Sequence, residues 1–340
     1  MFINIVLKSL DSVFNIDYDN YEIIIVDNAS NDGSFEKIKN YVEARKPSNI
    51  KVKIIKSDVN RGYSGGMNLG WNARDLDSKY VVFMNNDVVV ESDSLRKIIE
   101  YMESSHRIAA ANGLLYLGDC KRINTAGNYI SEDWDLGCIC NNVFEYECPG
   151  IDKPHYITYP TGAYMVIKAE IIKRVFPGGK PFMDVTFLYL DDDLVGLTLW
   201  NHGYKVAYIP VKAGVHFESL TLKRMSRRAL YYALRAQIAR IDAIRTRFST
   251  NRHVHIIATM IKHMFYNVLS RRDHDVSVSS FKVISDGIRL SKLIRLKIGT
   301  LDLYKAPYVP AGILNLWNRL ITYHILGVRQ PLVTFDMLKQ

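Results

Sequence analysis

The sequence predicts an α/β fold built on a mostly parallel, doubly wound sheet. Apolar runs such as Val81–Met84 are continuous, which is typical of strands that are buried on both faces. These runs alternate with segments of helical spacing between residues 3 and 104. Asp, Asn and Gly follow the runs, and polar residues at the carboxyl ends of parallel strands form ligand sites.

The individual elements follow from local patterns. Apolar residues recur at helical spacing over 3–14, and Tyr21–Val26 is a strand that ends at Asp27. The turn at Asn31–Ser34 caps the following helix. We then expect a helix over 34–45, a strand over 51–56, a loop over 60–66, a helix over 67–76, a strand over 80–84 and a helix over 93–104.

The second half is less regular. Residues 108–160 indicate short strands and loops, and residues 161–176 indicate a loop, a strand and a helix. A helix over 192–202 ends at Gly203, and a strand over 206–209 precedes Pro210. The remaining chain is helical and basic, so we expect a catalytic domain over 1–220 and a helical region over 221–340.

The net charge of +9 is spread unevenly along the 340 residues. Residues 1–220 carry 23 Lys and Arg against 29 Asp and Glu, whereas residues 221–297 carry 17 basic residues against 4 acidic ones. The basic region either packs on the catalytic domain or docks on an anionic membrane. No recognisable nucleic-acid-binding module is present, so nucleic acid is not expected as a partner.

We expect a cytoplasmic protein, with attachment at the inner face of the cell membrane as the role of a docking basic region. No stretch reaches the roughly 18 uncharged apolar residues of a membrane span, and the N-terminus lacks a secretory signal. Cys120, Cys138, Cys140 and Cys148 are therefore expected to be free thiols. A zinc site that adds His155 is the alternative, although the spacing matches no standard pattern.

Polar residues follow two of the expected strands. Asn85-Asn86-Asp87 interrupts an apolar run, and hard oxygen ligands there suit a divalent cation that carries phosphates; a plain polar turn is the alternative. Asp27 either contacts a base or ribose, or caps its turn. The glycines of residues 60–70 allow close backbone approach, and Arg61 beside them suits a phosphate, but no Walker motif follows.

Asp191-Asp192-Asp193 places three adjacent carboxylates at the start of a helix. Their repulsion costs stability unless a cation, the helix dipole or a function offsets it. Such a group suits a general base with a raised pKa, and capping of the helix is the alternative. His216 follows a strand and is either structural or completes a metal or diphosphate site.

Seven segments in order resemble glycosyltransferase family 2, particularly its rhamnosyltransferase-like branch. They cover about residues 5–220 and are 21–34, 60–70, 83–87, 161–163, 187–194, 203–206 and His216. The resemblance implies a GT-A fold and inverting transfer of a sugar from a nucleotide-diphospho-sugar. It implies a hydroxyl of a cell-surface polysaccharide or a lipid-linked glycan as the acceptor.

The resemblance also implies roles for the residues in these segments. Asp192 is the expected base, with Asp191 and Asp193 as alternatives because Leu194 stands where the family's second acid falls. Asp87, with Asn85 and His216, would hold Mg²⁺ or Mn²⁺. The residues expected to bind the nucleotide-sugar are Asp27, Asn28, Arg61, Gly62, Gly65, Gly66, Asn86, Thr161, Gly162 and Ala163.

One departure motivates an alternative function. The family usually begins with a strand of the type Val-Ile-Ile-Val-x-Tyr-Asn, whereas Met1-Phe2-Ile3 leads directly into the first helix. The first strand is therefore expected to be missing, which would leave neighbouring strand edges unpaired. A catalytically impaired relative that binds partners is the resulting alternative. A nucleotidyltransferase would need a Gly-rich loop with a Lys or Arg near the N-terminus, and none is visible.

Overall fold

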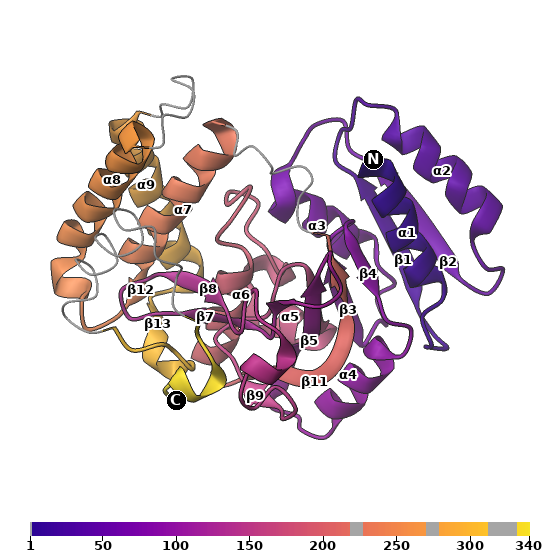
Figure 1. The fold of residues 1–340 in the computed structure, drawn as a ribbon. Coiled ribbons are helices and arrows are strands. Elements are labelled where there is room, and N and C mark those ends of the chain that lie inside the picture. The colour runs from indigo at the N-terminus through magenta and orange to yellow at the C-terminus, as the bar shows by residue number, and fades with distance from the viewer. Residues whose placement is uncertain (1, 218–226, 270–278, 312–331) are drawn as a thin grey trace.

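The computed structural model describes residues 2–217, 227–269, 279–311 and 332–340 (Figure 1). This part of the chain consists of a small two-stranded sheet, a larger mixed sheet and a group of C-terminal helices. The bounds of most elements lie within two residues of those expected from the sequence.

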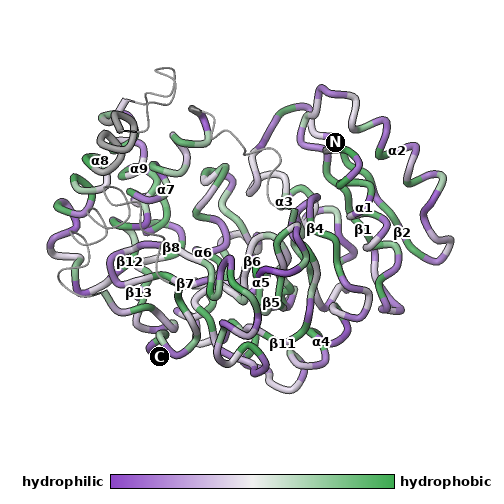
Figure 2. The backbone as a smooth tube through the Cα atoms, viewed as in Figure 1, coloured by the Kyte–Doolittle hydropathy of each residue, from purple (hydrophilic) through white to green (hydrophobic). Residues whose placement is uncertain are grey.

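The first unit is a two-stranded parallel sheet with helices packed on it. Its elements are α1 (Phe2–Phe14), β1 (Glu22–Asp27), α2 (Ser34–Arg45), β2 (Lys51–Lys56) and α3 (Gly62–Ala73). β1 and β2 pair in register from Glu22 opposite Lys51 to Asp27 opposite Lys56. Residues of α1, α2 and β1 form its core, in which Leu10, Phe14 and Val42 are buried. The outward face of α2 is largely hydrophilic (Figure 2).

The larger sheet has seven strands. They are β3 (Tyr80–Met84), β4 (Val88–Val90), β5 (Ile108–Leu117), β6 (Ile123–Thr125), β9 (His155–Tyr156), β10 (Tyr164–Lys168) and β11 (Lys205–His216). The main order is β3-β10-β5-β11-β4. β5 and β11 are parallel, β10 is antiparallel to β3 and β5, and β4 is antiparallel to β11. Thus β3, β5 and β11 share one direction, and β5 is buried along almost its whole length.

Helices cover this sheet and continue into the C-terminal region. α4 (Ser94–Glu103), α5 (Ala169–Val175) and α6 (Asp192–Asn201) pack against its strands. β7 (Asn128–Ile130) and β8 (Leu136–Cys138) form a hairpin. The later elements are α7 (Arg227–Ala243), β12 (Ile244–Arg245), α8 (Arg252–Leu269), α9 (Ser280–Ile298) and β13 (Leu301–Asp302). Short 3-10 turns lie at 145–147, 177–179, 249–251, 303–305 and 335–337.

The two sheets are joined through α1 and not through a strand. The Ser12 hydroxyl of α1 accepts a hydrogen bond from the Val90 amide of β4 at 3.0 Å, and the Asp17 amide donates to the Ser92 carbonyl at 2.8 Å. Within the described ranges, β2 is the only strand that pairs with β1, and β10 is the only strand that pairs with β3. One edge of β1 and one edge of β3 therefore lack a strand partner within these ranges.

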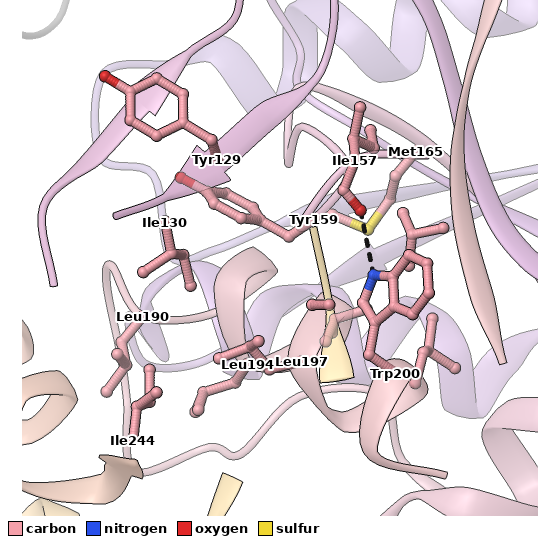
Figure 3. Packing of buried hydrophobic residues seen from close by; sticks show 14 of the residues in the cluster. Tyr129, Ile130, Ile157, Tyr159, Met165, Leu190, Leu194, Leu197, Trp200 and Ile244 are labelled. Carbon is pink, nitrogen blue, oxygen red and sulfur yellow. Dashed lines mark hydrogen bonds between the residues drawn. The ribbon is translucent and has the colours of Figure 1, made fainter. Parts of the chain in front are cut away.

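One large core unites the sheet with the C-terminal helices. Trp200 of α6 belongs to it, and its indole N–H donates to the Ile157 carbonyl at 3.0 Å (Figure 3). Leu194 of α6 and Ile244 of β12 belong to the same cluster (Figure 3). The basic region therefore packs on the preceding part of the chain, and none of its described helices is long and apolar enough to cross a membrane.

Two elements differ from their expected bounds. Helix α3 begins at Gly62 and not near residue 67, so the glycines form the first turns of a helix and not a loop. Strand β11 continues past Pro210 to His216, because the chain bends there and then resumes pairing with β5. The register of this pairing shifts between Tyr208 and Lys212.

The cysteines also differ from expectation. Cys140 and Cys148 are joined in a disulfide with a Cα–Cα distance of 5.7 Å, whereas Cys120 and Cys138 are not disulfide-bonded. The prediction of four free thiols is therefore wrong for one pair. His155 stacks on the Phe335 ring, and the four cysteines with His155 form no metal cluster within the described residues.

The close approach of α6 to the segment before Thr161 depends on Gly196. A Cβ added at Gly196 would overlap the Cβ of Tyr159 and lie 2.6 Å from the Thr158 carbonyl oxygen. Gly196→Ala should therefore destabilise the protein by about 1–3 kcal/mol, although alanine normally favours helix. A lower midpoint of thermal unfolding would measure the effect.

The matched control is Gly70→Ala in α3. A Cβ there would meet the Val26 side chain at 3.5 Å, which is an ordinary contact. Gly70→Ala should leave the midpoint unchanged or raise it. Equal midpoints for the two variants would contradict the proposed packing.

Candidate active site

The end of β1 contacts the start of α3 through side-chain hydrogen bonds. Asp27 is buried, and its Oδ2 accepts a hydrogen bond from the Ser30 amide at 3.1 Å, which is the capping role considered above. The Asn28 side chain accepts from the Arg61 amide and donates to the Gly62 carbonyl, both at 2.8 Å. These bonds hold the first turn of α3 at the carboxyl edge of the strand.

The glycines of α3 permit close contacts with other segments. Gly62 has a positive φ of +69°, and a Cβ there would overlap the Phe187 carbonyl oxygen. A Cβ at Gly65 would lie 2.6 Å from the Arg61 side chain, and one at Gly66 would lie 3.3 Å from an amide nitrogen at the end of β1. The glycines thus allow α3 to pack on β1 and on the segment that carries Phe187.

A cavity of about 380 Å³ lies against this face of α3. It is lined by Arg61, Gly65, Asn68, Leu69, Asn72, Lys180, Asp184 and Phe187. The Arg61 guanidinium also donates to the Ser57 hydroxyl at 3.2 Å, which holds it beside the cavity. Two cationic side chains at one opening suit a polyanionic ligand.

The turn between β3 and β4 and the end of β11 bring Asp87 and His216 together. The Asp87 Oδ1 lies 3.2 Å from the His216 Nε2, and both side chains are largely buried. The Asn124 side-chain oxygen lies 3.1 Å from the His216 Nδ1 and fixes the ring orientation. Asn85 donates its amide to the Ala163 carbonyl at 2.9 Å, and Asn86 is exposed.

The Asp87 and His216 donors suit a divalent cation that also binds a ligand. A carboxylate oxygen and an imidazole nitrogen face one another, which is a donor pair that Mn²⁺ accepts and that Mg²⁺ accepts less readily. Within the part of the chain that the structure describes, no three His, Cys, Asp or Glu side chains converge. The remaining ligands would therefore come from a diphosphate, from amides or from water.

The three consecutive aspartates have separate surroundings. Asp191 is buried and accepts a hydrogen bond from the Thr186 hydroxyl. Asp193 is fully buried and pairs with the Arg240 guanidinium at 2.7 Å. Asp192 is partly exposed, and its Oδ2 accepts from the Gly162 amide at 3.2 Å. Among the residues that the structure describes, the Asp192 carboxylate has no hydrogen bond or ion pair with another side chain, unlike the carboxylates of Asp191 and Asp193.

Burial raises the pKa of two of these aspartates. Burial, followed by the neighbouring Asp193 charge, raises the pKa of Asp192 to about 6. Burial also raises the pKa of Asp191 well above its usual range, against the lowering effect of the Thr186 hydrogen bond. Asp192 is thus ionised at neutral pH and is more basic than an ordinary carboxylate.

The segment Thr161–Ala163 connects these groups. Gly162 donates to Asp192, and its carbonyl accepts from the Tyr63 hydroxyl at 2.9 Å. The Ala163 carbonyl accepts from the backbone amide of Asn85, in the turn that carries Asp87. The structure therefore brings together the predicted acceptor segment, the predicted base and the predicted metal turn.

Several residues of the site were not predicted from the sequence. Tyr63 lies within a glycine-rich segment, yet its hydroxyl reaches across to residue 162. Asn124 orients His216, Asn112 accepts from the Thr161 amide at 3.3 Å, and Arg240 pairs with Asp193. They come from elements far apart in the chain, and no local pattern marks them.

Comparison with solved structures supports the GT-A fold. A mannosyltransferase from Pyrobaculum calidifontis, PcManGT, solved with GDP-Man and Mn²⁺, is 14% identical with a TM-score of 0.50, over 97% of this chain and 78% of that one. GalNAc-T7, solved with UDP, GalNAc and Mn²⁺, is 13% identical with a TM-score of 0.56, over 85% of this chain and 53% of that one. The predicted α/β GT-A fold is confirmed.

Sequence comparison addresses the family. An uncharacterized glycosyltransferase of Haemophilus influenzae is 29% identical over 108 residues, which is 32% of each chain, so this chain spans about a third of that relative's length. The family model for glycosyl transferase family 2 matches residues 3–176, which is more than half of the chain. The chain therefore belongs to glycosyl transferase family 2.

Proposed function

We propose that this protein transfers a sugar from a nucleotide-diphospho-sugar to a hydroxyl of an acceptor glycan, with inversion at the anomeric carbon. The observation that best supports the proposal is the junction at Gly162, where the Asp192 carboxylate and the Tyr63 hydroxyl meet one backbone unit. The adjacent Ala163 carbonyl holds the turn that carries Asp87. A base and a diphosphate-binding turn are thus fixed relative to each other.

In this mechanism Asp192 accepts the proton of the acceptor hydroxyl. The acceptor oxygen forms a bond to the anomeric carbon while the bond from that carbon to the diphosphate oxygen breaks. Asp87 and His216 would hold the divalent cation, and a bound cation neutralises charge that develops on the departing diphosphate. Arg61 and Lys180 at the cavity beside α3 would contact the donor. Tyr63 stays protonated, because burial raises its pKa.

The finer assignments rest on the sequence. The resemblance to the rhamnosyltransferase-like branch makes rhamnose the first sugar to test, on a polysaccharide or lipid-linked acceptor. The solved relatives with GDP-Man and with UDP make Mn²⁺ the first cation to test, and they favour a panel of nucleotides. The division at residue 220 remains a prediction, as do the donor contacts of Asp27, Asn28 and Asn86.

A catalytically impaired relative is the second candidate. It is favoured by the strand edges of β1 and β3 that lack a partner within the described residues, because these edges flank the nucleotide-binding side. Such a protein would bind an acceptor or partner but would not show cation-dependent binding of nucleotides. The two candidates are therefore separable by binding measurements alone.

Attachment to an anionic membrane is proposed for the exposed face of α9. This face combines apolar and basic side chains, and the exposed ones are Phe281, Lys282, Arg289, Lys292, Leu293 and Leu296. Such a face suits the surface of an acidic bilayer and would bring the site close to lipid-linked acceptors. The predicted basic region over 221–297 also includes residues 221–226 and 270–278, which lie outside the described residues.

The first prediction from the proposed mechanism concerns pH. With a pKa of about 6, Asp192 must lose its proton to act, so kcat/KM should rise with pH up to about 6 and then level off. Asp192→Asn should reduce kcat by at least about a hundredfold and abolish this dependence. The measurement is the pH profile of sugar transfer with a panel of nucleotide-sugars.

The control for this prediction is Asp93→Asn, since Asp93 is an exposed carboxylate paired with Lys97. It should leave the profile unchanged. Full transfer activity in Asp192→Asn would refute the assignment of the base.

The second prediction concerns cation-dependent binding. His216→Ala and Asp87→Asn should each weaken the Mn²⁺-dependent binding of the matching nucleoside diphosphate by at least about tenfold, because each removes a ligand. Calorimetry with GDP, UDP and dTDP, with and without Mn²⁺, measures the loss. His106→Ala, at an exposed histidine, should bind as the unaltered protein does. Absence of cation-dependent binding in the unaltered protein would favour the impaired relative.

The third prediction concerns the membrane. Replacement of Leu293 and Leu296 by Ser should weaken co-sedimentation with anionic phosphatidylglycerol vesicles, and the remaining binding should decrease as salt is added. Leu76→Ser alters another exposed leucine and should have no effect. Equal binding to neutral and anionic vesicles would contradict the proposed docking.

A further inference from the structure

The backbone that leads into Asp192 is held in an unfavourable conformation. Phe187, Tyr189 and Leu190 all have positive φ, at 63°, 65° and 64°. Residues with a Cβ rarely adopt this left-handed region, because the Cβ approaches the following carbonyl. Three such residues within four positions persist only where surrounding contacts determine the conformation. These contacts therefore control where Asp192 lies.

On one side, helix α3 contacts this segment. The Tyr63 amide donates to the Phe187 carbonyl at 2.6 Å, and Gly62 has no Cβ that would collide with the same oxygen. The contact connects the segment to the start of the helix that lines the cavity beside Arg61.

On the other side, helix α7 contacts the same segment. The Arg235 guanidinium donates to the carbonyls of Val185 and Thr186. The Tyr232 ring stacks on the Phe187 ring, with 4.6 Å between centroids and 19° between planes. Phe187 is therefore held between α3 and α7, which lie far apart in the sequence.

A third contact fixes the residue after the proposed base. Arg240 of α7 pairs with Asp193 at 2.7 Å, and the two side chains are 6% and 0% exposed. A buried carboxylate without a cation would be strongly unfavourable. Because the charge of Asp193 also raises the pKa of Asp192, the Arg240 cation acts against that effect at short range.

The charges around Asp192 come from several elements. The ionisable groups that face it are Tyr63 of α3, Tyr159 before β10, and the flanking Asp191 and Asp193. The cations that act on these neighbours are Arg240, which acts on Tyr159 and Asp193, and Arg235, which acts on Asp191. Both are in α7, so this helix supplies the positive charge behind the carboxylates.

We propose that Arg240 and Arg235 of α7 are positioning residues for Asp192, so that α7 is part of the active site although it lies beyond the segment that the family model matches. The proposal rests on the proposed function of Asp192 as the base. Arg235 holds the strained approach to the aspartates, and Arg240 holds Asp193 and compensates its charge. Neither residue touches the substrate in this role.

The experiment compares pH profiles of kcat/KM in the full chain with Mn²⁺ and the transferable nucleotide-sugar. Arg240→Met leaves the Asp193 charge uncompensated, so the acidic limb should move to higher pH by about one unit and kcat at neutral pH should decrease. Asp193→Asn removes a negative charge beside Asp192, so the limb should move to lower pH. A purely structural role would not move the limb in opposite directions.

Two further variants keep the test decisive. If Arg240→Met fails to fold, Arg240→Lys replaces it, which should retain the position of the limb while lowering kcat through the altered geometry. Arg235→Met should lower kcat with little change in KM for the donor. Arg245→Met is the matched control, because Arg245 is exposed and pairs with Asp302, away from the aspartates. It should behave as the unaltered protein.

The outcomes separate this proposal from the proposed function. If Asp192→Asn retains activity, the function assigned to Asp192 fails. If Asp192→Asn is inactive but the limb stays in place in Asp193→Asn, and also in Arg240→Met where that variant folds, the positioning role alone is overturned. Movement of the limb in the predicted directions would support both.

Discussion

The backbone of Gly162 is the point on which the geometry of the site depends. Its amide donates to Asp192 and its carbonyl accepts from Tyr63, while the next carbonyl binds the Asn85 amide. A side chain at this position would lie 3.2 Å from the Tyr63 hydroxyl oxygen and 3.4 Å from the Asp192 carboxylate. Glycine is therefore the residue that leaves room for these groups. Through these bonds, helix α3, helix α6 and the turn that carries Asp87 keep fixed positions relative to one another.

The C-terminal helices extend this organisation and give the basic region two kinds of positive charge. Some cations are structural: Arg240 pairs with buried Asp193, and Arg295 pairs with Asp242 at 2.8 Å between α9 and α7. Others, such as Lys292 of α9, face solvent without an ion pair among the described residues. From the sequence alone, the basic region is expected either to pack on the catalytic domain or to dock on a membrane. The structure assigns packing to one face of its helices and leaves the opposite face exposed.

Much of the fold could be predicted because its signals are local. The strand that precedes Asp27 and the helix over 34–45 are determined by apolar periodicity and turn residues within short windows. Contacts between segments far apart in the sequence could not be predicted from such local patterns. The glycines after Arg61 suggested a loop, yet they form helix because Gly62 packs against Phe187 from a segment more than a hundred residues away. The disulfide between Cys140 and Cys148 likewise depends on how a loop closes in space.

The sequence alone determined the class of the fold, the order of its elements and the set of carboxylates and amides that are proposed to carry the chemistry. Residue type and spacing are sufficient for these conclusions, because strands, turns and hard oxygen ligands have local signatures. Only the tertiary structure distinguished Asp191, Asp192 and Asp193. Their types are identical, but Asp191 accepts a hydrogen bond from nearby Thr186, Asp193 pairs with Arg240 of the distant helix α7, and Asp192 faces Gly162. Burial and pairing in three dimensions place identical neighbours in the chain in different surroundings, and the role proposed for Asp192 follows from its own.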